Sequence, residues 1–372
     1  MNISELEQIL SKELRDDKRR IEWLSKLIQG LYLAKTTNLS KVARSIKDKS
    51  KVQSRYRRLQ RFFEHFDFEQ GVCSGIVMNL FDWGNTKPYL LMDRTEWEYG
   101  KTWLNILVVA VAYKRRAIPI AWVVLPTRGN SSIKARAELL ESIFAKIGIE
   151  SFGGLLADRE FIGREWFAYL NKLKLPFYIR IKAGADTLNT RGQSVEIGWL
   201  FHQLKPGEQM ELPKTRQIYG HNLKVWGAKS PADGELMVVV SNDHSKNNIE
   251  VYLQRWDIET LFGSLKSHGF DFEQTHLVSH AKIRKLLFVL TLAYAWALKV
   301  GIFIHQRIKT VPLKNHRRPL YSLFRVGLDF LCEALFMGSS KAIKFAIKAF
   351  LNKHPPPLSA RQVSFLRSFV VY

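Results

Sequence analysis

The chain has 372 residues, of which 46% are hydrophobic and 12% aromatic. A chain this apolar can bury enough surface to offset the entropy of ordering, which excludes intrinsic disorder, and its length allows about two domains. Lys and Arg number 57 and Asp and Glu number 34, so the net charge is +23. Because such an excess repels itself unless it faces a polyanion, we expect a nucleic acid partner, with a membrane surface as the alternative.

The two cysteines, Cys73 and Cys332, are too few for a disulfide framework or a thiolate zinc cluster, which favours a reducing cytoplasm. The N-terminus is charged throughout and lacks an apolar core, so we expect no secretory signal there. The longest apolar stretch, residues 286–298, is followed at once by Lys299 and is shorter than the ~18 to 20 residues that span a bilayer. We therefore expect a buried helix and no membrane partner.

Residues 1 to about 80 are predicted to be helical, because apolar residues such as Ile21, Leu24, Ile28 and Leu31 recur at intervals of three and four. Residues 41–61 carry nine Lys or Arg and a single Asp. Such a run is typical either of a solvated helix face or of a face that contacts phosphates. The charge of the whole chain favours DNA.

After Pro88 the pattern changes to short apolar runs that indicate β-strands. The predicted strands are residues 89–93, 104–113, 118–126, 153–158 and 176–183. Helical patterns lie at residues 131–147 and 163–173. Strands that alternate with helices predict an α/β fold with a mixed sheet covered on both sides.

Residues 184–245 lose the helical signal and carry Gly, Pro and Asn around short strand candidates, so we expect a β-rich insertion. A helical pattern then runs from Ile249 to about residue 269. A long apolar helix at 284–306, a basic linker at 307–319 and two further helices near 320–337 and 340–352 complete the chain.

Asp93 and Asp158 each close a predicted strand, the place where α/β sheets position ligand chemistry. Taken singly, each is more typical of an ordinary residue at a strand end. The helix after residue 249 supplies a third group. At ~100° per residue, Tyr252, Arg255 and Glu259 fall at about 0°, 300° and 340°, and Lys266 falls at about 320°. A surface ladder of ion pairs explains Arg255, Glu259 and Lys266, but not Tyr252 on the same line.

Two aspartates from strand ends and a glutamate from a packed helix form a hard oxygen cluster, which suits Mg²⁺ or Mn²⁺ rather than zinc. Such a cluster can hold two ions ~3.5 to 4 Å apart for in-line attack at phosphorus. Arg255 and Lys266 would neutralise the substrate phosphate, which carboxylates alone repel.

The spacing of Tyr252, Arg255, Glu259 and Lys266 resembles that of the DDE transposases of bacterial insertion sequences, in the family-four branch marked by a Tyr-Arg-Glu-Lys (YREK) signature. The resemblance covers roughly residues 85–270. It implies an RNase H-like mixed sheet flanked by helices, with a β-rich insertion and helical N- and C-terminal regions. It also implies that Asp93, Asp158 and Glu259 are catalytic and bind Mg²⁺ or Mn²⁺, with two ions expected.

By the same resemblance, Tyr252, Arg255 and Lys266 would contact DNA phosphates beside the transposon end. Trp256 matches a position where related enzymes carry an aromatic residue near a flipped base, although a Trp there could also cover the core. The expected segments are a helical DNA-binding region at 1–84, a first part of the catalytic core at 85–183, the β-rich insertion at 184–246, a second part of the core with the Glu-bearing helix at 247–300, and a helical C-terminal region at 301–372.

The sequence therefore predicts a cut-and-paste transposase that binds terminal inverted repeats, cleaves DNA ends with a divalent metal and joins them to target DNA. Two alternatives stay open: a non-catalytic DNA-binding protein derived from a transposase, and an RNase H-like nuclease that cuts without joining. Double-stranded DNA is the expected partner, a dimer is expected in the synaptic complex, and the expected location is the bacterial cytoplasm, in association with the nucleoid.

Overall fold

The computed structural model of the chain describes residue 14 and residues 17–69, 71–100, 102–189, 191–244, 248–315, 319–355 and 357–370, with the side chain of residue 248 left aside. Residues 1–13, 15 and 16 of the predicted helical region lie outside the described residues. The chain divides into two compact units. The sheet unit consists of Trp83–Thr95 and Asn105–Thr260, and the helical unit consists of Met1–Asp82, Glu96–Leu104 and Leu261–Tyr372.

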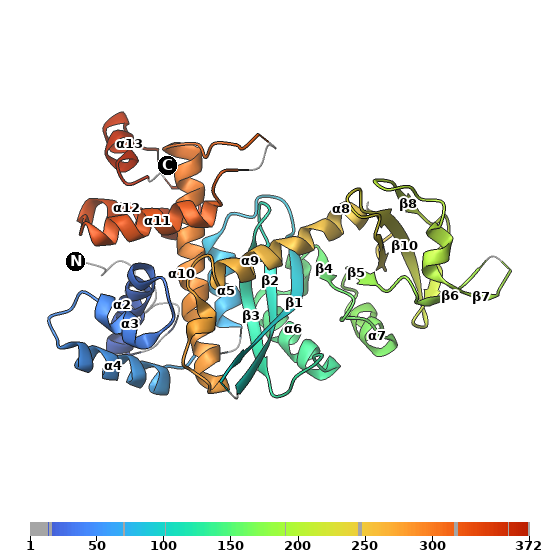
Figure 1. The fold of residues 1–372 in the computed structure, drawn as a ribbon, viewed down its shortest axis with the longest axis horizontal. Coiled ribbons are helices and arrows are strands. Elements are labelled where there is room, and N and C mark those ends of the chain that lie inside the picture. Colours follow the sequence, from blue (N-terminus) through green and yellow to red (C-terminus); the bar gives the residue numbers. More distant parts are fainter. Residues whose placement is uncertain are drawn as a thin grey trace. The chain divides into compact units, whose positions relative to one another are not determined.

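The sheet unit is built on a mixed sheet in the order β3-β2-β1-β4-β5-β11-β10-β8 (Figure 1). β1, β4 and β5 are parallel neighbours, whereas β3 pairs antiparallel with β2 and β11 pairs antiparallel with β5. The strands of this path are β1 Tyr89–Tyr99, β2 Thr102–Ala112, β3 Ala117–Leu125, β4 Gly154–Ala157, β5 Phe177–Ile181, β8 Gln209–Glu211, β10 His221–Lys229 and β11 Leu236–Ser241. β9 Arg216–Ile218 pairs with β10, and β6 Asp186–Leu188 pairs with β7 Ser194–Glu196.

The apolar runs form strands where the sequence predicts them, but the first strand is longer than expected. β1 continues to Tyr99, so Asp93 lies in the middle of the strand, and the prediction that Asp93 closes it is wrong. The reason is that β1 has two different neighbours. Its register with β4 ends at Met92 and Ala157, whereas β1 itself runs on for seven more residues after Met92. Asp93 therefore follows the last residue of β1 that pairs with β4.

Helices flank this sheet. α6 Ile133–Ile147 packs on β3, and α7 Arg164–Lys172 packs on α6 and β10. α8 Asn248–Leu253 packs on β5, β10 and β11. The continuous helix predicted from Ile249 is wrong, because a 3₁₀ turn at Gln254–Trp256 separates α8 from α9 Asp257–Leu265. In this turn the backbone N–H of Asp257 donates to the carbonyl of Gln254, which winds the chain more tightly than an α-helix.

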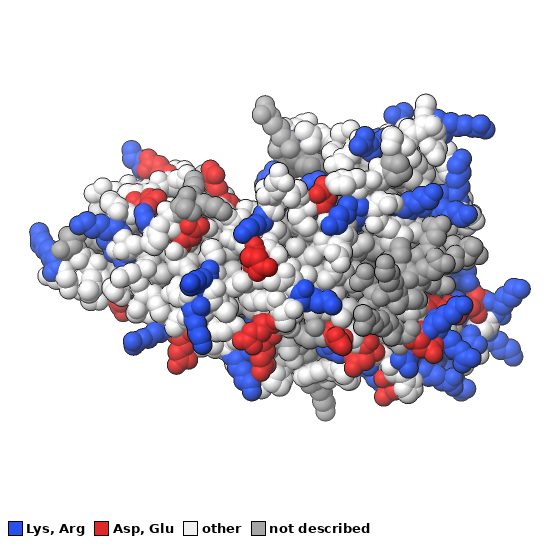
Figure 2. Space-filling model, turned by 180° about the vertical axis from the view of Figure 1, so that it is seen from behind, with Lys and Arg blue, Asp and Glu red and all other residues white. Residues whose placement is uncertain are grey.

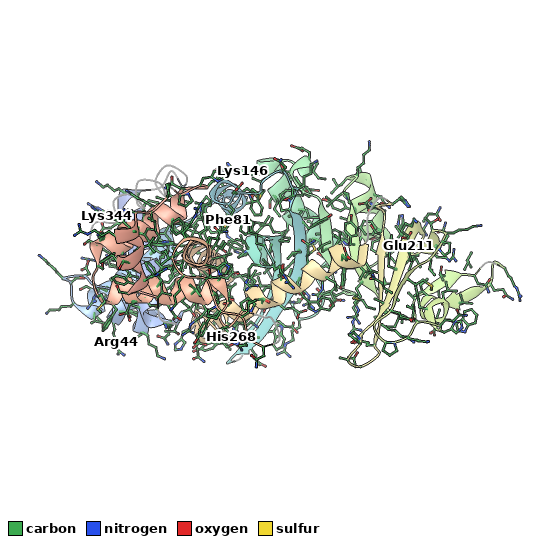
Figure 3. All side chains as sticks on the ribbon, turned by 90° about the horizontal axis from the view of Figure 1, so that it is seen from above. Arg44, Phe81, Lys146, Glu211, His268 and Lys344 are labelled. Carbon is green, nitrogen blue, oxygen red and sulfur yellow. The ribbon has the colours of Figure 1, made fainter. Side chains whose placement is uncertain are left out.

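The helical unit contains α2 Lys18–Ala34, α3 Leu39–Ser45, α4 Val52–His65, α5 Val72–Leu80, α10 His280–Arg307, α11 Leu323–Phe336, α12 Ser340–Leu351 and α13 Ala360–Arg367. The 3₁₀ turn Phe272–Gln274 and the far ends of β1, β2 and α9 also belong to this unit. α10 packs against α2, α4, α11 and α12 (Figure 1). Arg44 of α3 and Lys344 of α12 carry their charges to the surface (Figure 3).

α10 confirms the prediction of a buried apolar helix. By length and composition it could cross a membrane, but 94% of its most apolar window is buried inside the protein. Two lysines of α10 are buried with it and donate to helix ends: Lys285 to the carbonyls of Phe63 and Glu64, and Lys299 to those of Leu80 and Asn352. Burial lowers the pKa of Lys299 to about 7. These contacts satisfy backbone acceptors that would otherwise have no partner at the ends of neighbouring helices.

Candidate active site

The two predicted aspartates lie on neighbouring parallel strands of the sheet unit. Asp93 follows the last β1 residue that pairs with β4, and Asp158 comes directly after β4. Because Met92 is in register with Ala157, these two carboxylates leave the paired region at the same level. Each also accepts a hydrogen bond from the backbone N–H of the next residue, at 2.7 Å for Asp93 and 2.6 Å for Asp158. Each carboxylate is thereby oriented by the backbone of the residue that follows it.

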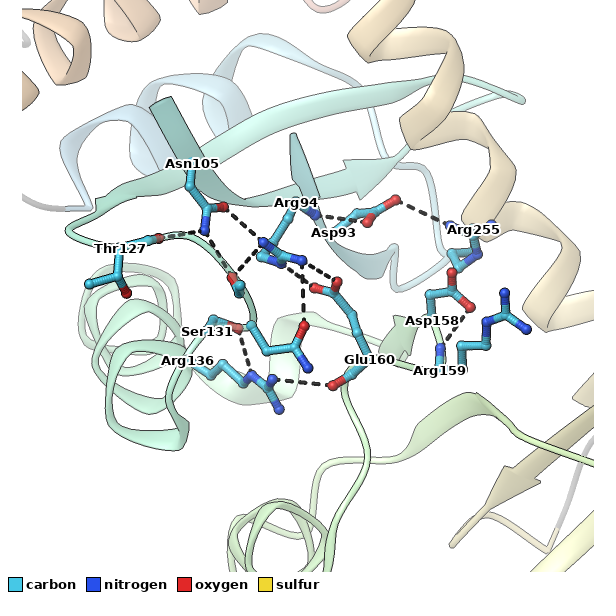
Figure 4. A network of polar contacts seen from close by, with 12 residues as sticks. Asp93, Arg94, Asn105, Thr127, Ser131, Arg136, Asp158, Arg159, Glu160 and Arg255 are labelled. Atoms are coloured by element: carbon cyan, nitrogen blue, oxygen red, sulfur yellow. Dashed lines mark hydrogen bonds and ion pairs between the residues drawn. The ribbon is translucent and has the colours of Figure 1, made fainter. Parts of the chain in front are cut away.

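Arg255 connects Asp93 to the predicted glutamate. Its guanidinium donates from Nη1 to Asp93 Oδ2 at 3.2 Å and from Nη2 to Glu259 Oε1 at 2.7 Å. The Arg255 side chain is only 5% exposed, whereas that of Glu259 is 54% exposed. The 3₁₀ turn positions Arg255 among buried groups, while α9 leaves Glu259 at the surface. The structure therefore brings Asp93, Arg255 and Glu259 together in one chain of contacts (Figure 4 shows Asp93 and Arg255).

The environment of Asp93 disfavours its charge. Burial raises the pKa of Asp93 to about 6, the nearby Arg255 charge lowers it, and the charges of Glu160 and Asp158 raise it. Asp93 is therefore a carboxylate that ionises only near neutral pH and that lies within electrostatic reach of two other carboxylates. Such a group gains more from a nearby cation than an exposed aspartate does.

The aromatic residues of the predicted stripe have opposite exposures. Tyr252 is fully buried, and the centroid of its ring lies 6.2 Å from that of Trp256, which is 40% exposed. The Arg255 guanidinium lies 5.5 Å from the centroid of the Trp256 ring. Burial raises the pKa of Tyr252, and the charge of nearby Asp158 raises it further. Tyr252 thus packs beneath the site, and Trp256 is the aromatic side chain at the surface.

Lys266, the last residue of the predicted signature, follows α9 and belongs to the helical unit. Its ammonium forms an ion pair with Glu273 at 2.7 Å and lies 5.5 Å from the centroid of the Trp97 ring. The described contacts of Lys266 are thus with residues of its own unit.

A second polar network adjoins the two aspartates, centred on Arg94 (Figure 4). Its guanidinium holds Glu160 with two hydrogen bonds, from Nε at 2.7 Å and from Nη2 at 2.8 Å. Nη1 donates to Asn105 Oδ1 at 3.0 Å and to the carbonyl of Gly129 at 2.7 Å. Arg136 donates to the backbone carbonyl of Glu160 at 3.2 Å. Arg94, which follows Asp93, is thereby bound to Glu160, which lies two residues after Asp158.

The family model described as "Transposase DDE domain" matches residues 84–296, which is more than half of the chain. The chain belongs to this transposase family. The matched range includes Asp93, Asp158 and Glu259, together with the Arg94 network.

A solved structure, the cryo-EM structure of the piggyBac transposase synaptic complex with hairpin DNA, is similar to this transposase with a TM-score of 0.42 and 10% sequence identity. The similarity covers 93% of this chain and 79% of that chain. It is too weak for residues to be compared between the two. No curated protein is a match for this transposase.

The carboxylates of this transposase are suitable donors for a divalent metal ion. Asp93 and Asp158 supply hard oxygen atoms from adjacent strands. Burial is the main cause that raises the pKa of Asp93, and the charge of Asp158 adds to it. Glu259 is held by Arg255 instead. Among the described residues, no three His, Cys, Asp or Glu side chains form a group that could hold a metal ion. The two aspartates are therefore suitable metal ligands, whereas Glu259 is connected to Asp93 through the guanidinium of Arg255.

The residue spacing did not predict the Arg94 network of this transposase, in which Glu160 lies two residues after Asp158. A signal was present in the sequence: an arginine directly follows both aspartates, at Arg94 and Arg159. A charged residue in a half-buried strand needs a partner of opposite charge, and Glu160 is that partner.

Proposed function

We propose that this transposase cleaves DNA at the ends of a mobile element and joins each freed 3′ hydroxyl to target DNA, as an insertion-sequence enzyme of the YREK branch with an RNase H-like core. The observation that carries the proposal is the pairing of Asp93 and Asp158 on adjacent parallel strands, with Glu259 connected to Asp93 through Arg255. The parallel strands β1, β4 and β5, with antiparallel β3 at one side, support the proposed core.

Asp93, Asp158 and Glu259 are proposed to hold Mg²⁺ or Mn²⁺, with two ions in the complete site. Bound cations would lower the pKa of an attacking water or 3′ hydroxyl and stabilise the leaving oxygen. Within the chain itself, the role of Arg255 is to hold the carboxylates of Asp93 and Glu259 in place from a buried position. Tyr252 supports Arg255 from beneath, and neither residue is at the surface to contact a phosphate in this conformation.

The pKa of Asp93 predicts a pH dependence of cation binding. Because burial raises this pKa to about 6, Asp93 is protonated below pH 6 and a cation must displace the proton. We expect the affinity for Mn²⁺, measured by electron paramagnetic resonance of the free ion, to weaken about tenfold for each pH unit below 6. The Asp93→Asn variant should bind Mn²⁺ more weakly and should lose this dependence. A wild-type affinity that stays constant between pH 5 and 7 would contradict the assignment.

DNA binding by the helical unit is supported by its charge and by a groove of about 740 Å³. The groove is lined by Lys41, Arg44, Arg61 and Lys282, together with Tyr56 and other residues. α4 buries only a narrow stripe near its C-terminal end and exposes most of its first two turns. Lys and Arg side chains gather at the lower right of Figure 2, at the end of the helical unit that carries these helices. We propose that the terminal inverted repeat is bound here.

Trp256 is proposed to stack on a DNA base. An exposed Trp that packs against a buried Tyr and an Arg offers a rigid flat surface, and stacking of this kind is worth about 1–3 kcal/mol per base. Because two DNA ends must be cut and joined together, we propose a dimer in the DNA complex and action on DNA in a bacterial cytoplasm, at the nucleoid.

The test is incubation of the purified protein with a labelled duplex that carries the terminal repeats of its own element, with Mg²⁺ or with EDTA. Metal-dependent cuts at the repeat boundary, followed by products joined to a target plasmid, are the expected result. Cuts without joining would favour the nuclease alternative. Tight binding without cuts, in Mg²⁺ and in Mn²⁺, would favour the non-catalytic DNA-binding alternative.

A further inference from the structure

The turn between β2 and β3 has an unusual composition for its geometry. Tyr113 and Arg116 exchange two backbone hydrogen bonds, of 2.7 and 2.9 Å, and enclose a loop of only two residues, Lys114 and Arg115. Both loop residues have positive φ, of 47° and 61°. A two-residue hairpin loop with positive φ at both positions is a type I′ turn.

Asn-Gly is the preferred pair in a type I′ turn, because residues with a larger side chain are strained in the left-handed region. Among the residues that the structure describes, Lys114 and Arg115 are the only two consecutive non-glycine residues with positive φ. Strained backbone positions are more frequent at functional sites than elsewhere. The side chains at this turn are thus a place to look for one.

The turn presents positive charge at the end of the β2–β3 hairpin. Lys114 and Arg115 are exposed, and Arg116 is half-buried. Burial raises the pKa of Asp257, and the charges of Arg116 and Arg115 lower it, so this carboxyl lies within electrostatic reach of the turn. Arg115 and Arg116 thus act on one partly buried carboxylate, and Lys114 adds a third positive charge to the turn. Asp257 directly follows Trp256, so the turn lies beside the start of α9.

We propose that the Lys114–Arg115 turn is a second DNA contact, separate from the carboxylates, in which both side chains bind backbone phosphates of the duplex held at the active site. This inference rests on the proposed DNA substrate. The backbone of a two-residue loop is constrained, so its two side chains leave the turn in defined directions. The two cationic groups can therefore contact successive phosphates of a DNA strand. The carboxyl of Asp257 lies within electrostatic reach of Arg115 and Arg116 at the base of the turn.

The experiment replaces the strained pair with the pair that the turn prefers, in the variant Lys114→Asn/Arg115→Gly. The full-length protein is titrated with a labelled duplex of the terminal repeat over a series of salt concentrations, and its melting temperature is recorded. The control is Lys134→Gln/Lys146→Gln on α6, which removes the same charge from exposed positions of the same unit (Lys146 is labelled in Figure 3).

We expect the turn variant to melt at a higher temperature than the wild type and to bind DNA less tightly. Loss of two phosphate contacts should reduce the slope of log affinity against log salt by about 1.8. When salt is raised fourfold, the loss of DNA affinity should therefore be about twelve times smaller for the variant than for the wild type. The α6 control should keep the wild-type slope.

If the wild type binds DNA with a clear salt dependence and the turn variant keeps the same slope, the role of the turn is overturned while the proposed function stands. If the α6 control loses as much slope as the turn variant, the effect is one of net charge and the specific contact is overturned. A wild type with no salt-dependent DNA binding would overturn the proposed function and the role of the turn with it.

Discussion

Replacing Glu259 by alanine is expected to reduce DNA-end cleavage by about a thousandfold or more while leaving DNA binding close to that of the wild type. A metal-binding carboxylate is worth several kcal/mol in the transition state, and about 4 kcal/mol corresponds to a thousandfold in rate. Glu259 adds negative charge to the surface that is proposed to face DNA, so its removal should not weaken the attraction to phosphate. Single-turnover cleavage and a binding titration on the same duplex measure the two effects separately.

Loss of folding is a competing explanation that a second variant excludes. Glu259→Gln keeps an oxygen that can accept the hydrogen bond from Arg255, so the buried guanidinium keeps its partner while the charge is lost. We expect this variant to melt like the wild type and to cleave as poorly as Glu259→Ala. The matched control is Glu250→Ala, an exposed glutamate of α8, which should cleave normally. Normal cleavage by Glu259→Gln would remove Glu259 from the catalytic set.

Much of the sheet could be predicted from the sequence, because its strands are apolar runs with few alternatives. β2 is buried along nearly its whole length, and its predicted range differs from the observed one by only one or two residues at each end. The position of Asp93 could not be predicted in the same way. β1 pairs with β4 only as far as Met92 and then continues to Tyr99. In the sequence the apolar run ends at Met92, so the strand is predicted to close at Asp93.

The candidate site was predicted from the residue spacing, but the contacts within it depend on tertiary packing. A uniform rotation of ~100° per residue places Arg255 on the same line as Glu259, as the structure also does through their hydrogen bond. It cannot reveal the 3₁₀ turn or the burial of Arg255 against Asp93, since both depend on the sheet beneath. α13 was also not predicted, although its capping box of Ser359 and Gln362 was a signal available in the sequence.

Replacing Glu160 by glutamine is expected to slow cleavage about a hundredfold, although Glu160 is not one of the proposed metal ligands. Arg94 follows Asp93, Glu160 comes two residues after Asp158, and their two hydrogen bonds fix one aspartate relative to the other. A displacement of about 1 Å at a reacting centre can cost about a hundredfold in rate. Single-turnover cleavage at a saturating concentration of protein measures the change independently of DNA affinity.

The same substitution should also destabilise the sheet unit. The side chains of Arg94 and Glu160 are only 12% and 22% exposed, so the neutral amide leaves a partly buried guanidinium without its counter-charge. We expect a loss of about 2–3 kcal/mol in the free energy of unfolding, measured by urea denaturation. The double variant Arg94→Met/Glu160→Met should lose less than the sum of the two single variants, because it leaves neither charge unpaired. Additive losses would show that the pair is not coupled.

A pH profile separates positioning of Asp93 from a general loss of stability. The negative charge of Glu160 is one of the causes that raise the pKa of Asp93, so its removal should lower this pKa and move the acidic limb of the cleavage profile to lower pH. Glu165→Gln, an exposed residue in the first turn of α7, is the matched control and should shift neither the profile nor the rate. A variant that cleaves slowly with an unshifted profile would reduce the network to structural support. A shifted profile, with cleavage slowed in the fully folded protein, would place Arg94 and Glu160 beside the carboxylates as the residues that position them.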